Sequence, residues 1–117
     1  MQFDVEVVLR ERADAVTERI LHSGHDAAEW DETDVEAVLK AILLAIERVR
    51  DPQSVPRHVA LRGFSWIVEP VEGGVAIAIE IPSGAAVAGP FATERARLDG
   101  LVSRVIAAAA PSRPVVH

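Results

Sequence analysis

Hydrophobic and polar residues alternate along the first strand-length segment of the chain. Phe3, Val5, Val7 and Leu9 are separated by polar positions, and only Val8 breaks the pattern. A period of two places successive side chains on opposite faces of a strand. The segment therefore predicts a half-buried β-strand whose apolar residues face a core.

The following segment, residues 11–31, fits two interpretations. In RADAVTERILHSG, Ala13, Val16 and Ile20 follow a helical spacing, and Gly24 stands where a helix often ends. This pattern predicts an extra short helix near residues 12–22. The stretch VTERIL also suits a second strand, so helix and strand both remain open here.

A long amphipathic helix is predicted between Thr33 and Pro52. Thr33 and Glu36 match the T-x-x-E pattern of a capping box, with Asp34 in the first turn. Pro52 prevents the helix from continuing. The core-facing stripe consists of residues at helical spacing: Val35, Val38, Leu39, Ile42, Ile46 and Val49.

The same helix is also apolar on a second side. Leu44 lies about 200° around the helix axis from Ile42, beside Ala37 and Ala41. A helix that is apolar on two sides is usually buried on both. Either the N-terminal segment folds over Ala37, Ala41 and Leu44, or these residues form an interface with another subunit or a protein partner.

Residues 59–89 predict a meander of three strands. Phe64, Trp66 and Val68 share one face of the first strand, and Gly63 is a candidate bulge. The alternating segment VAIAIEI forms the second strand and AAVAG the third. The two turns between the strands fall at PVEGG and PSG.

A final helix is predicted after the meander. Thr93 is the expected N-cap, and Glu94 is expected in the first turn. Its core stripe contains Leu98, Leu101, Val102, Val105 and Ala109. Residues 111–117 predict an irregular tail, which leaves residues 1–110 as a single domain.

Together these segments predict an α+β fold with two layers. We expect an antiparallel or mixed sheet of about four strands, in the order β-α-β-β-β-α, with two main helices packed on one face. The first strand is expected beside the meander, where a helical crossover allows parallel pairing. The order of elements resembles that of double-stranded-RNA-binding domains and ribosome-hibernation factors. This is a likeness in the pattern of elements only, and topology alone does not transfer function, but it is the ground for considering a nucleic-acid or ribosome-associated domain.

Composition and charge narrow the classes of function. The 117 residues include no cysteine, which excludes disulfides and thiolate chemistry and favours a cytoplasmic location. The start of the chain lacks the pattern of a signal peptide, and no apolar run is long enough for a membrane span. The net charge is −6, and the lysine-rich stretches that bind phosphate are absent, so nucleic acid is a disfavoured partner.

The stretch HSGHDAAEWDETD, residues 22–34, is the densest group of candidate ligands. His22, His25 and Glu29 would suit zinc or iron if they faced one point. Ser23 and Gly24 interrupt any helix that would align them. We therefore favour a loop followed by a helix cap, with Trp30 as a hydrophobic anchor on the first turn.

Outside residues 22–34, the sequence offers few candidate sites. The segment GPFATER brings Thr93 and Arg95 to a helix start, which is a feasible anion-binding site, although it is also an ordinary way to begin a helix. No serine stands in a G-x-S-x-G motif, and no catalytic residue or cofactor is predicted.

The sequence therefore predicts a non-catalytic protein-interaction or assembly module that associates with itself or with another protein. One alternative is a small-ligand-binding domain or enzyme with a pocket between sheet and helices. The second alternative is the nucleic-acid or ribosome-associated domain.

Overall fold

The computed structural model describes residues 1–53, 55 and 59–109. The irregular tail predicted for residues 111–117 lies outside the described residues. The described elements are β1 (Gln2–Leu9), β2 (Val16–Leu21), the 3₁₀ turn η1 (Ala27–Glu29), α1 (Glu32–Arg50), β3 (Ser65–Val71), β4 (Gly74–Ile81), β5 (Gly84–Phe91) and α2 (Arg95–Ala109). This confirms the α+β class, with five strands in place of about four.

All five strands form one antiparallel sheet in the order β2-β1-β5-β4-β3. Of the two interpretations of residues 11–31, the strand through VTERIL is confirmed: Val16–Leu21 pair with β1 as a hairpin, and the extra short helix considered near residues 12–22 does not form. The hairpin adds one reversal of chain direction, so β1 runs antiparallel to β5 and the parallel pairing considered for it does not occur. The added strand also changes the element order that suggested the nucleic-acid alternative.

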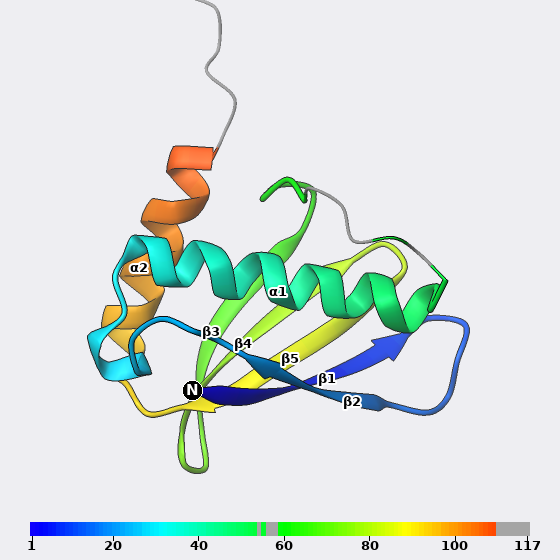
Figure 1. Cartoon of the computed structure of the whole chain (residues 1–117), viewed down its shortest axis with the longest axis horizontal. Coiled ribbons are helices and arrows are strands. Elements are labelled where there is room, and N and C mark those ends of the chain that lie inside the picture. The colour runs from blue at the N-terminus through cyan, green and yellow to red at the C-terminus, as the bar shows by residue number, and fades with distance from the viewer. Residues whose placement is uncertain (54, 56–58, 110–117) are drawn as a thin grey trace, which may run out of the picture.

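The two helices cover one face of the sheet (Figure 1). The predicted core stripe of α1 is buried, and Leu98, Leu101, Val102 and Val105 of α2 are buried as well, whereas Ala109 is exposed. From the sheet, the core receives the inward side chains of the alternating strands, among them Phe3, Val5, Val7, Val68, Ile77, Ile79 and Phe91. Of the described helices, neither is long and apolar enough to cross a membrane.

Helix α1 begins two residues earlier than the sequence suggested. Asp31, in an extended conformation, is the N-cap; its side chain accepts the Asp34 backbone N–H at 2.9 Å, and the Asp34 carboxylate accepts the Asp31 N–H in return. The capping box predicted at Thr33 and Glu36 is therefore wrong. An aspartate is as good an N-cap as threonine, so the competing D-x-x-D pattern was equally available.

Helix α2 also differs at its start, and the predicted bulge lies elsewhere. The first helical residue is Arg95, so Glu94 precedes the first turn and Thr93 lies in the preceding bend. Gly63 lies before β3, in the left-handed region with φ +79°, and is not a bulge. The pairing of β4 with β5 instead shifts near Gly89, which has φ +133° and precedes a cis proline.

Candidate functional site

The segment between β2 and α1 is fixed by a buried tryptophan. Trp30 is fully buried and donates its indole N–H to the His25 carbonyl at 2.7 Å. Its ring meets the rings of Phe91 and His22 edge-on, with centroids 4.8 and 5.8 Å apart. This confirms that Trp30 anchors the segment, and it brings both histidines to the start of α1.

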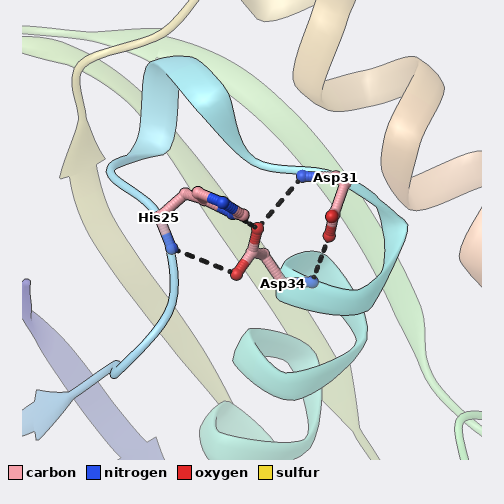
Figure 2. Close-up of side chains that lie close together, drawn as sticks. All are labelled: His25, Asp31 and Asp34. Carbon is pink, nitrogen blue, oxygen red and sulfur yellow. Dashed lines mark hydrogen bonds and ion pairs between the residues drawn. The ribbon is translucent and has the colours of Figure 1, made fainter.

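The carboxylate of Asp34 is the centre of the site. Its Oδ1 accepts Nε2–H of His22 at 2.9 Å and the backbone N–H of His25 at 3.3 Å. Its Oδ2 accepts Nδ1–H of His25 at 2.8 Å and the backbone N–H of Asp31 at 3.2 Å. Figure 2 shows the bonds that His25 and Asp31 make to Asp34. We call Asp34, His22 and His25 the aspartate clamp, because the three residues join the end of β2 to the start of α1.

Burial and hydrogen bonding act in opposite directions on Asp34. Burial of the carboxylate raises its pKa, but the bonds from His25, from the Asp31 N–H and from His22 outweigh burial and hold the pKa of Asp34 well below its usual value. The hydrogen bond and the negative charge of Asp34 in turn raise the pKa of His25. The clamp therefore stabilises an ionised aspartate beside an imidazolium.

The aspartate clamp explains why residue 24 is a glycine. A Cβ at this position would lie 1.9 Å from Oδ1 of Asp34 and 2.5 Å from Nε2 of His22, inside the hydrogen bond that joins them. The sequence interpretation of Gly24 as the end of a helix is wrong, because no helix precedes it. A larger residue would displace the bond.

The candidate metal set from the sequence is only partly brought together. His22 and His25 meet at Asp34, whereas Glu29 lies exposed in η1. The potential ligand atoms that cluster within 4.8 Å belong to His25, Asp31 and Asp34. Both oxygens of Asp34 already accept two hydrogen bonds each, and the positive end of the α1 dipole disfavours a cation here. These contacts favour the clamp over a metal centre.

His25 is held as a general base would be. Its Nδ1 faces a buried carboxylate, while its side chain is 58% exposed. Such a base acts on a nucleophile or substrate within hydrogen-bond reach. In the described part of the chain, no serine or threonine hydroxyl is bonded to the His25 ring.

The remaining sequence candidates lie apart from the clamp. On α1, Ala37 is exposed, and Ala41 and Leu44 are half-buried; the N-terminal segment that could have covered them forms β2 in the sheet. Arg95 donates its Nε–H to the Val68 carbonyl at 3.0 Å and so ties α2 to β3.

The face of the sheet opposite the helices is a second candidate. We call it the open face. Its exposed large hydrophobic residues are Val8, Leu21, Ile67, Val71 and Val87, and only Val16 and Val55 lie elsewhere among the described residues of this kind. An open hollow of about 330 Å³ on this face is bordered by Ile67, Ala78 and Val87. In the sequence, the available sign of this face was an apolar residue where the alternation calls for a polar one, such as Val8.

Comparison of the chain with family models, with curated proteins and with solved structures finds no significant match.

Proposed function

We propose that the protein is a non-catalytic association module that pairs with a second copy of itself through the open face. The carrying observation is that five of the seven exposed large hydrophobic residues among those described lie on this one face. Scattered surface hydrophobics are normal, whereas a face that concentrates them is typical of an interaction site. A cytoplasmic location is part of the proposal and is favoured by the absence of cysteine.

The dimensions of the open face support a second copy as the occupant. Five strands of about seven residues span roughly 550 Å², from the usual strand spacing and rise. A biological interface is expected to bury at least about 500 Å² on each partner, and the standard size is about 800 Å². Two sheets packed face to face would bury Ile67, Ala78 and Val87 of both copies, as in a β-sandwich.

The proposal is tested by solution mass. Light scattering after size exclusion, over a tenfold range of protein concentration, should give twice the chain mass of 12.6 kDa for the wild type. Val87→Glu should be folded and monomeric, because it buries a charge in the interface. Ile67→Glu repeats the test from β3, so the result does not depend on one variant.

Leu44→Glu is the matched control, because Leu44 lies on α1 and not on the sheet. It should leave the dimer intact. A dimer broken by Leu44→Glu and not by Val87→Glu would assign the interface to Ala37, Ala41 and Leu44 instead. A wild-type monomer at every concentration would overturn self-association altogether.

A further inference from the structure

A pocket of about 390 Å³ lies at the end of the sheet where α1 finishes. The loop after β1, the last residue of α1 and the turn between β4 and β5 meet there (Figure 1). The backbone N–H of Arg10 donates to the Ser83 carbonyl at 3.0 Å and joins the loop to the turn. The pocket is lined by Leu9, Arg10, Glu11, Arg12, Arg50, Pro82 and Ser83.

The charge of this pocket is opposite to that of the whole chain. Three arginines and one glutamate line it, in a protein whose net charge is −6. A concave site lined by one sign of charge concentrates ions of the other sign. The volume also lies within the usual range for small-molecule sites.

Two of the three guanidinium groups are held in place with donors to spare. Arg12 donates Nη1–H to the Val49 carbonyl at 3.0 Å, at the end of α1. Arg50 donates Nη2–H to Glu47 at 2.6 Å. A guanidinium has five N–H donors, so each group keeps donors for a ligand.

Arg10 is not explained by these structural contacts. Its side chain has no hydrogen-bond or ion-pair partner among the described residues, although its backbone is fixed by Ser83. Capping the end of α1 requires Arg12 alone. An unpaired arginine that lines the same pocket as two oriented guanidinium groups is suited to a carboxylate or phosphate group, whose oxygens accept paired N–H donors.

We propose that this pocket binds a compact anion with at least two negative charges, whose phosphate or carboxylate oxygens are held by Arg10, Arg12 and Arg50. The pocket adjoins the open face, because Arg10 also lines hollows there with Val8 and Glu80. Pyrophosphate and citrate are the probes, titrated by calorimetry in a phosphate-free buffer. Sodium chloride at matched ionic strength is the control for screening.

The variant Arg10→Gln should bind the probe about tenfold more weakly or worse, the scale of one lost charge-assisted contact. Its melting temperature without probe should match that of the wild type, because the Arg10 side chain makes no internal bond. Arg104→Gln removes an exposed arginine that pairs with Glu32 at 2.9 Å and should keep wild-type affinity. Arg12→Gln provides a second test of the pocket if Arg10→Gln fails to fold.

Saturable binding of either probe that is lost in Arg10→Gln and kept in Arg104→Gln supports the site. The probe that binds more tightly identifies phosphate or carboxylate as the preferred group. No saturable binding at millimolar concentration, or equal binding by Arg10→Gln and the wild type, overturns the proposal.

Discussion

A methyl group at Gly24 would occupy the space of a buried hydrogen bond. Its position, 1.9 Å from Oδ1 of Asp34, leaves no arrangement in which the His22–Asp34 bond survives unchanged. We expect Gly24→Ala to lower the free energy of unfolding by about 1–3 kcal/mol, the usual cost of leaving a buried polar group unpaired. Urea denaturation measures this difference.

Gly100→Ala in α2 is the matched control. There the nearest atom to a new Cβ is Nη1 of Arg104 at 3.4 Å, an ordinary contact with the end of a flexible side chain. Replacing a helical glycine should stabilise the protein by up to about 1 kcal/mol. If both variants gained stability, Gly24 would not be constrained by the clamp.

The aspartate clamp also makes the free energy of unfolding depend on pH. The dependence has two limbs, an acidic one from Asp34 and one above about pH 6.5 from His25. The lowered pKa of Asp34 gives stability that is complete above the unfolded value of about 3.9 and is lost as pH falls below it. The raised pKa of His25 gives stability that is complete below about 6.5 and is lost as pH rises through the folded value. We expect the clamp to contribute most between about pH 4 and pH 6.5.

His25→Gln separates the two limbs. Its free energy of unfolding, measured in urea from about pH 2 to pH 9, should lack the decline that His25 causes above pH 6.5. The acidic limb should persist, because Asp34 keeps its bonds from His22 and from the Asp31 N–H. A parallel decline in wild type and variant above pH 6.5 would rule out His25 as its source.

At the scale of elements, the observed cap of α1, Asp31, differs from the predicted cap, Thr33. Asp31→Ala should cost about 0.5–2 kcal/mol, because it removes the acceptor for the Asp34 N–H. Thr33→Ala should change stability by less than about 0.5 kcal/mol, because Thr33 is exposed within the first turn. Thermal or urea unfolding of the two variants decides between them, and the reverse ranking would restore the T-x-x-E box.

Periodicity predicted most of the elements, because β1, α1, β4 and α2 each bury one regular face. It left helix and strand open at β2, where Glu18 and Arg19 interrupt the apolar pattern. Those side chains are used in ion pairs: Glu18 with Arg48 of α1, and Arg19 with Asp4 of β1. A strand at the sheet edge, stabilised partly by such pairs, has little periodicity to detect.

Only part of the candidate site could be predicted from the sequence. His22, His25 and Trp30 stood out by residue type and spacing, and the loop-and-cap interpretation agrees with the contacts. The role of Asp34 did not stand out, because four donors from three separate residues meet it only after the segment folds. Contacts that form only in the folded protein leave no recognisable pattern in the local sequence.

For the whole molecule, charge gives self-association a distinctive salt dependence. Glu6 and Glu80 flank Val87 on the open face, and the chain carries a net charge of −6. Two copies therefore repel each other, and salt screens that repulsion. Raising NaCl from about 0.05 M to 0.5 M should strengthen the dimer several-fold in sedimentation equilibrium. The double variant Glu6→Gln/Glu80→Gln should reduce the effect, and a dimer weakened by salt would contradict it.

The strand order has a consequence for how the chain reaches its fold. β1 precedes the other four strands in the sequence, yet it lies inside the sheet, between β2 and β5. Its hairpin with β2 can form early, because the two strands are adjacent in sequence. Its other edge pairs with Gly84–Phe91 and stays unpaired until those residues are available. The emerging chain must therefore keep this edge of β1 from pairing wrongly until β5 has been synthesised. Long-range closure of β1 on β5 is the step expected to limit the rate of folding.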